Sequence, residues 1–194
     1  MTAHHFITVV SGLPRSGTSM MMQALNAGGI PPLTDGERTA DDDNPHGYYE
    51  LECAKQIKKS DAFLDDALGK AVKLIHLLVT RLPARHEARV VFMRRDIDEV
   101  LASQAKMLVR SGKQGGAVKP EVLKGVFTKQ LKETMDWLVA QPNIQVLEVG
   151  FREMFDNPTA EMDKIAAFLG GGLDVDAMAR AVDPSLYRNR QPKP

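Results

Sequence analysis

Gly12-Leu-Pro-Arg-Ser-Gly-Thr-Ser19 is the stretch that decides the fold, because its composition predicts a phosphate-binding loop. An apolar, β-rich run over residues 6–10 precedes it, and residues 18–27 are typical of a helix. In such a strand, turn and helix unit, backbone N–H groups and the helix dipole favour an anion. Gly12 and Gly17 let the backbone turn tightly beside the ligand. The alternative, an ordinary Gly- and Ser-rich turn, is disfavoured by the preceding strand.

The loop departs from ATP-binding loops in a way that indicates a different ligand. An ATP-type loop has a lysine after its second glycine, whereas this chain has Thr18, and the nearest cation is Arg15. Phosphoryl transfer from ATP also normally uses a metal held by an aspartate after another strand. The best second core strand, over residues 89–93, ends instead in Arg94 and Arg95, and arginine suits bidentate phosphate contacts. We therefore expect a multiply anionic ligand bound without a metal.

With these motifs the chain resembles the sulfotransferases that use 3′-phosphoadenosine-5′-phosphosulfate (PAPS) and release adenosine 3′,5′-bisphosphate (PAP). Its loop looks like the family's site for the 5′-phosphosulfate, in which Arg15 takes the place of the family's basic residue. The resemblance implies PAPS as co-substrate, no metal, and donor contacts from Pro14, Arg15, Ser16, Gly17, Thr18 and Ser19.

A second segment is similar to the family's 3′-phosphate site, in which an arginine ending a strand precedes a helical serine by eight residues. Arg95 and Ser103 have that spacing. Asp96 and Glu99 are spaced as in a capping box, which predicts a helix starting just after Arg95. We expect Ser103 on the flank of this helix, able to donate to an anion; a solvated serine is the alternative. Arg94 should point to the opposite side of its strand.

A third segment, Phe151 to Pro158 followed by a helix over 159–169, is similar to the family's late strand-turn-helix unit. It supports the fold rather than the chemistry. The Arg-Lys-Gly segment that helps hold the 3′-phosphate in animal cytosolic members has no convincing copy here. Arg188 and Arg190 are candidates to replace it, and a basic frayed tail is the alternative.

Catalysis needs charge stabilisation on the sulfuryl and bridging oxygens and a base for the acceptor proton. Arg15 and the loop donors can supply the first. Lys73, in a predicted strand over 71–75, resembles the family's second catalytic lysine, with a solvent-facing lysine as an equal alternative.

Three residues compete for the role of base. Glu50 comes first, because Asn44-Pro-His-Gly-Tyr-Tyr-Glu50 resembles a bacterial sulfotransferase segment whose glutamate lies near the acceptor. His76 comes second, although it follows Lys73 by three positions rather than the family's two, an offset that reverses its face in a strand. His46, in a loop, is a further candidate.

The order of strands and helices predicts an α/β fold. We expect one domain over 1–194, with a three-layer, P-loop NTPase-like architecture and a mostly parallel central sheet flanked by helices. The ligand should bind at the carboxyl ends of the strands. Met20 to Met22 are interpreted as helix packing. A second long helix has an apolar stripe formed by Val122, Leu123, Val126, Phe127, Leu131, Met135 and Leu138.

Composition narrows the function classes further. The net charge is zero, which disfavours a general nucleic-acid binder. No run approaches the roughly 18 apolar residues of a membrane span, no signal-peptide pattern is visible, and Cys53 is the single cysteine, so we expect a cytoplasmic protein. The acceptor should be a small molecule or glycan-like, and a homodimer is left open. The acidic loop Thr34 to Asn44 is by default a surface loop; the alternative is that it covers the acceptor, in which case its acidity favours a basic or polyhydroxyl one.

Two rival functions follow from the same residues. One is a kinase-like P-loop nucleotide enzyme, disfavoured by the missing lysine and the missing metal-binding aspartate. The other is a noncatalytic module that binds the sulfonucleotide but has no working base. The sequence therefore favours a PAPS-dependent sulfotransferase that acts on a hydroxyl or amine.

Overall fold

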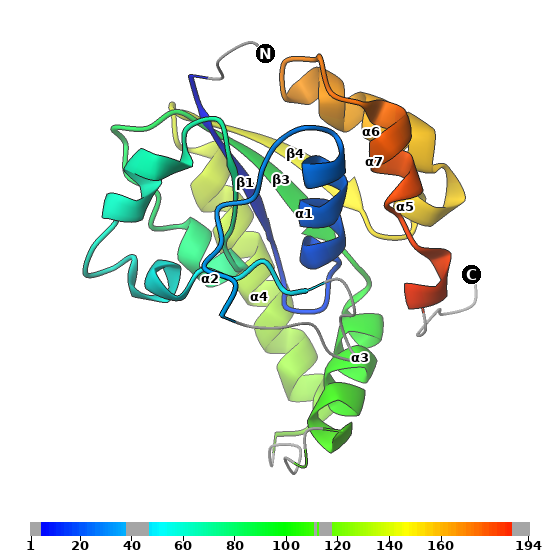
Figure 1. The fold of residues 1–194 in the computed structure, drawn as a ribbon. Helices are drawn as coiled ribbons and strands as arrows, with labels where there is room; N and C mark the ends of the chain where they lie inside the picture. The colour runs from blue at the N-terminus through cyan, green and yellow to red at the C-terminus, as the bar shows by residue number, and fades with distance from the viewer. Residues whose placement is uncertain (1–4, 38–46, 111, 113–117, 188–194) are drawn as a thin grey trace.

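The computed structural model describes residues 5–37, 47–110, 112 and 118–187, and it is built on a four-stranded parallel sheet (Figure 1). The strands are β1 (Ile7–Gly12), β2 (Ala71–Lys73), β3 (Ala88–Arg94) and β4 (Ile144–Gly150), in the order β2-β1-β3-β4. All three strand pairs are parallel. The predicted α/β fold with a parallel central sheet is confirmed.

Helices cover both faces of the sheet. One face carries α1 (Thr18–Ala27), α5 (Glu153–Asp156), α6 (Pro158–Phe168) and α7 (Val175–Arg180). The other carries α2 (His76–Val79), α4 (Pro120–Val139) and the 3-10 turns η1 (Glu52–Gln56) and η2 (Ala62–Ala67). The remaining elements are α3 (Ile97–Arg110) and η3 (Pro184–Leu186). Among the described residues, no helix is long and apolar enough to span a membrane.

Alternating strand residues divide the apolar core into two layers. On β3, Val90 and Phe92 pack against α4 and η2, whereas Val91 and Met93 pack on the side of α1 and α6. This alternation follows from the two-residue period of a strand, and burial on both faces makes the strand almost continuously apolar. Met20, Met21 and Met22 are buried, as their interpretation as helix packing required.

The strand order places the ends of β1 and β3 side by side where the chain's direction of winding reverses. From β1 the chain crosses to β2 on one side and then returns to β3 on the other. In parallel sheets the loops diverge at such a point and leave a crevice for a ligand. The loop after β1 and the Arg94-Arg95 pair after β3 therefore flank one crevice.

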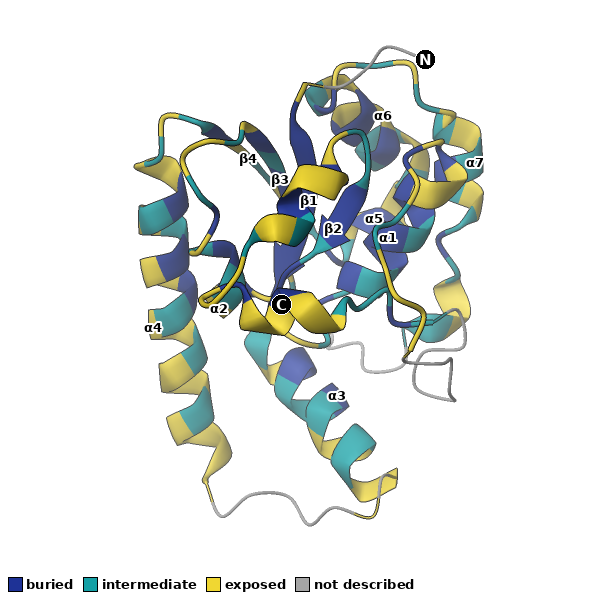
Figure 2. Ribbon diagram, turned by 60° about the vertical axis from the view of Figure 1, so that its left-hand side comes forward, coloured by how far each residue is buried: buried dark blue, intermediate teal, exposed yellow. Residues whose placement is uncertain are grey.

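Helices α3 and α4 extend beyond the sheet, and this changes part of the predicted core (Figure 2). The apolar stripe of α4 is buried only where it meets the sheet, at Leu131 and Leu138, while Val122 and Val126 are 55% and 42% exposed. On α3 the buried residues are Glu99, Val100 and Ser103, so its buried face includes two polar side chains. The hydrophobic periodicity predicted both helices, but it did not predict how far they extend beyond the sheet.

Leu138→Ala should lower the free energy of unfolding by about 2–5 kcal/mol, because it removes a fully buried side chain between α4 and the sheet. Its sequence neighbour Val139 is 74% exposed, so Val139→Ala should change stability by less than about 0.5 kcal/mol. Urea unfolding of the two variants measures this difference. Equal losses would contradict the described packing of α4.

Candidate active site

A cleft of about 370 Å³ lies at the carboxyl ends of the strands. Three regions line it: the loop after β1, the segment containing Tyr48 and Glu50 together with Lys73 on β2, and a wall formed by α3 with Phe151 and Phe155. Its position is the one that the strand order predicts for a ligand site in a parallel sheet.

The loop after β1 is folded so tightly that glycine is required at two positions. Gly17 has φ +96°, and a Cβ there would lie 2.5 Å from Cδ2 of Phe151. A Cβ on Gly12, at φ +146°, would lie 2.7 Å from the carbonyl oxygen of Met93. Ser16 is buried and donates its hydroxyl to the carbonyl of Leu13 at 2.7 Å. The Ser16 side chain therefore holds the turn, whereas Pro14, Arg15, Gly17, Thr18 and Ser19 line the cleft.

Arg15 joins the loop to the segment after β3. Its backbone is left-handed, with φ 70°, which is uncommon for a residue with a side chain. Its carbonyl accepts a 2.9 Å hydrogen bond from Nη1 of Arg95. Its own Nε donates to Oγ of Ser103 at 3.1 Å. The structure thus brings together three residues that sequence reasoning assigned to two separate phosphate sites.

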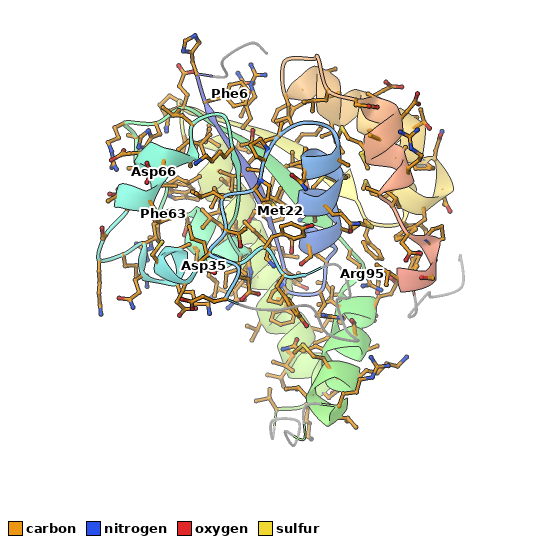
Figure 3. All side chains as sticks on the ribbon, viewed as in Figure 1. Phe6, Met22, Asp35, Phe63, Asp66 and Arg95 are labelled. Carbon is orange, nitrogen blue, oxygen red and sulfur yellow. The ribbon has the colours of Figure 1, made fainter. Side chains whose placement is uncertain are left out.

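Arg95 is held deep in the wall of the cleft, where α3 begins (Figure 3). Its side chain is 6% exposed, its Nε donates to Oε2 of Glu99 at 3.0 Å, and its guanidinium lies 4.1 Å from the centroid of the Phe151 ring. Burial lowers the pKa of Arg95, and the Glu99 carboxylate opposes that shift; the guanidinium remains charged. Nη2 is buried and has no hydrogen-bond partner among the described residues.

Tyr187, near the end of the described chain, completes this cluster. Its hydroxyl donates to Oε1 of Glu99 at 3.0 Å and accepts a hydrogen bond from Nε of Arg152 at 3.3 Å. Its ring lies edge-on to Phe151, with centroids 5.0 Å apart. The C-terminal segment therefore reaches the site through a tyrosine. Arg188 and Arg190, predicted to play this part, lie outside the described residues.

Glu99 does not complete the predicted capping box. Oδ1 of Asp96 accepts hydrogen bonds from the backbone N–H groups of Asp98 and Glu99, at 2.9 and 3.1 Å, so the helix starts where expected. The carboxylate of Glu99 turns instead to Arg95 and Tyr187. The four-residue spacing of Arg95, just before α3, and Glu99, in its first turn, was the available sequence signal for this pair.

Lys73 and Glu50 meet on the opposite side of the cleft. Nζ of Lys73 donates to the carbonyl of Tyr48 at 2.5 Å and to Oγ of Ser19 at 3.3 Å. Oε1 of Glu50 lies 3.6 Å from the same Nζ, and the two side chains are 8% and 26% exposed. Lys73 therefore points into the site, not into solvent as the alternative required.

Of the two described candidates for the base, His76 is the one that the fold keeps out of the cleft. It is the first residue of α2, is buried, and has its Nε2 3.0 Å from Oε1 of Gln130 on α4. It is absent from the residues that line the cleft. The offset argument assumed an extended strand, whereas β2 ends at Lys73 and His76 begins α2, so the packing of α2 against α4 keeps His76 out of the cleft. His46 lies outside the described residues.

Sequence reasoning missed two kinds of lining residue, cations on α3 and an aromatic ring beside the loop. Lys106 and Arg110 follow Ser103 at helical spacing on α3, so periodicity could have found them. Phe151 was noted only as part of a fold motif, and its contact with Gly17 is visible only in three dimensions. Within the described part of the chain, no group of three or more His, Cys, Asp and Glu side chains could hold a metal.

Comparison with known proteins places this geometry in context. The family described as "Sulfotransferase domain" matches residues 7–193. No curated protein matches the sequence.

Among solved structures, the sulfotransferase domain from the curacin biosynthetic pathway is 14% identical with a TM-score of 0.55, over 100% of this chain and 94% of that one. A sulfotransferase from Alicyclobacillus acidocaldarius is 18% identical with a TM-score of 0.54, over 93% and 87%. A mouse sulfotransferase complexed with PAP is 16% identical with a TM-score of 0.53, over 98% and 69%. At these identities the likeness shows a shared fold.

His76→Gln should reduce the loss of stability in mild acid. Burial lowers the pKa of His76 in the folded protein. Below the unfolded value of about 6.5, the unfolded chain binds a proton that the folded chain does not, so stability falls as pH falls towards the folded pKa. Urea unfolding between about pH 7.5 and pH 5.5 compares the slopes of the two proteins. Parallel curves would contradict a buried, neutral imidazole.

Proposed function

The chain belongs to the sulfotransferase family and transfers sulfuryl groups, and on that premise we propose that its donor is PAPS, bound in the cleft after β1 and β3 without a metal ion. The observation that carries the proposal is the contact of Arg15 with both Ser103 and Arg95. This contact joins the loop after β1, which is shaped for one anionic group, to the junction of β3 and α3, which is suited to a second anionic group.

The residues present fit both anionic ends of PAPS. At the loop, Gly17 lets the backbone pass directly beside the Phe151 ring, and the start of α1 presents backbone donors at the cleft. At α3, Nη2 of Arg95 is buried without a hydrogen-bond partner among the described residues, and Arg95 and Ser103 line the same cleft. We assign the 5′-phosphosulfate to the loop and the 3′-phosphate to Arg95 and Ser103.

In this proposal Arg15 lies between the 5′-phosphosulfate and the 3′-phosphate of the donor, and it acts at the sulfuryl end. Its guanidinium supplies positive charge next to the loop, where the sulfuryl and bridging oxygens of the donor would lie. Pro14, Thr18 and Ser19 line the same part of the cleft. Ser16 acts indirectly in this proposal, since its hydroxyl bond to Leu13 keeps the turn in shape.

Lys73 and Glu50 are proposed as the catalytic pair. The donor supplies an activated sulfuryl group; Lys73, already bonded to the loop through Ser19, stabilises the charge that develops on its oxygens. Glu50 takes the proton from the acceptor hydroxyl or amine. Its carboxylate, 3.6 Å from Nζ of Lys73, stands at the same point of the cleft. His76 has no place in this scheme because its ring packs against α4.

A kinase-like function is not supported by the residue types. Thr18 stands where an ATP-type loop has its lysine, and β3 ends in arginines rather than in an aspartate. A noncatalytic sulfonucleotide-binding module would keep the phosphate contacts but would not need Glu50 beside Lys73. The first of the two experiments below separates the ligand classes, and the second separates an enzyme from a binding module.

Ser103→Ala should weaken PAP binding by about 10- to 100-fold while 5′-AMP affinity changes little, because it removes a hydrogen bond to the charged 3′-phosphate. Calorimetric titration with PAP, 5′-AMP and ATP, with and without magnesium, measures this ratio. The exposed Thr128→Ala on α4 is the control. Equal losses for PAP and 5′-AMP would refute the assigned 3′-phosphate site, and a preference for ATP with magnesium would overturn the donor.

Glu50→Gln should reduce transfer of radioactive sulfuryl from PAPS by about 10²- to 10⁴-fold, because the acceptor proton loses its base. PAP affinity should stay within about twofold of that of the unmodified protein, since the amide keeps the shape of the side chain and lies outside the assigned phosphate contacts. Unchanged turnover would remove Glu50 from the mechanism.

A further inference from the structure

Two cations line the cleft on α3 beyond Ser103. Lys106 and Arg110 are exposed residues of the lining, and Met107 lies between them. All three share the helical face of Ser103, because they follow it by three, four and seven positions. The backbone of Arg110 lies roughly 10 Å along the helix axis from that of Ser103, at about 1.5 Å per residue. The α3 wall thus has two positively charged side chains outside the proposed donor site.

The described lining of the cleft is strongly one-sided in charge. Its cations are Arg15, Lys73, Arg95, Lys106 and Arg110, and its one carboxylate is that of Glu50. The whole chain has a net charge of zero, so this is a local concentration of positive charge. A cleft lined by one sign of charge raises the local concentration of ligands of the opposite sign. The described lining therefore favours anionic ligands.

The proposed donor accounts for only part of that charge. Arg15 and Lys73 serve the sulfuryl end, and Arg95 serves the 3′-phosphate beside Ser103. Arg110 lies two helical turns beyond Ser103, on the part of α3 that extends past the sheet (Figure 2). The apolar side chains of Met107 and Ile75 also line the cleft. This outer part of the cleft combines apolar surface with two cations.

We propose that Lys106 and Arg110 bind an anionic group of the acceptor, a carboxylate, sulfate or phosphate carried beside the hydroxyl or amine that is sulfated. The inference rests on the proposed function, because it assigns the acceptor end of the same cleft. The two cations also offset the repulsion between a negatively charged acceptor and the Glu50 carboxylate. This acceptor differs from the basic or polyhydroxyl one expected from residues 34–44, most of which lie outside the described residues.

Matched acceptors test the proposal directly. The pairs are methyl β-glucoside against methyl β-glucuronide, and tyramine against para-hydroxyphenylacetate, which differ in the presence of a carboxylate. Radioactive transfer from PAPS gives kcat/KM for each, and calorimetry gives binding to the PAP-loaded protein. The anionic member of a pair should be preferred by about tenfold, as expected for two partly exposed charge contacts.

Reversing the charge of Lys106 and Arg110 tests the proposal through the preference between two acceptors, which would not change if these residues had only a structural role. The double variant Lys106→Glu, Arg110→Glu should invert the preference within a pair and leave PAP affinity within about twofold. Lys129→Glu, an equally exposed charge change on α4 outside the cleft, should alter neither.

Three results would overturn the proposal. One is an unchanged preference in the double variant. Another is a large loss of PAP affinity in that variant, which would assign these cations to the donor. The third is that no anionic member binds the PAP-loaded wild-type protein or accepts a sulfuryl group from PAPS at millimolar concentration. Absence of PAP binding to the wild-type protein would instead refute the proposed function, so the two failures are distinguishable.

Discussion

The hydrogen bond from Arg95 to the carbonyl of Arg15 is the contact on which the rest of the site depends. Arg15 holds a backbone conformation that costs a residue with a side chain of order 1–3 kcal/mol. The donor that compensates for it comes from the end of the neighbouring strand, 80 residues later in the chain. The loop is therefore shaped by the order of the strands as well as by its own sequence.

Arg95 can play this part because it is itself fixed. Glu99 neutralises it, the Phe151 ring covers one side of the guanidinium, and Tyr187 holds the carboxylate from the end of the described chain. A buried ion pair adds little net stability, since desolvation offsets most of the attraction, but removing one partner is costly. We interpret the role of the cluster as positional: it fixes the loop, α3 and the C-terminal segment relative to one another.

The parts of the fold and site that could be predicted were those written in local sequence. The loop after β1, the start of α3 at Asp96 and the outward direction of Arg94, which pairs with Glu148, follow from turn chemistry, capping and strand alternation. The burial of His76 under α4 and the exposure of Val122 depend on how far each helix extends over the sheet. That distance is a property of the packed molecule, which periodicity within one helix does not contain.

The contact between Gly17 and the Phe151 ring has a consequence for how such a site can vary among related chains. Position 17 and position 151 share one volume, because the ring occupies the space that a side chain on the loop would need. A side chain at position 17 is disfavoured twice, by the φ of +96° and by the ring, and a smaller residue at position 151 would remove only the second obstacle while uncovering the guanidinium of Arg95. The loop glycine and the aromatic ring directly after β4 should therefore be retained together in related chains.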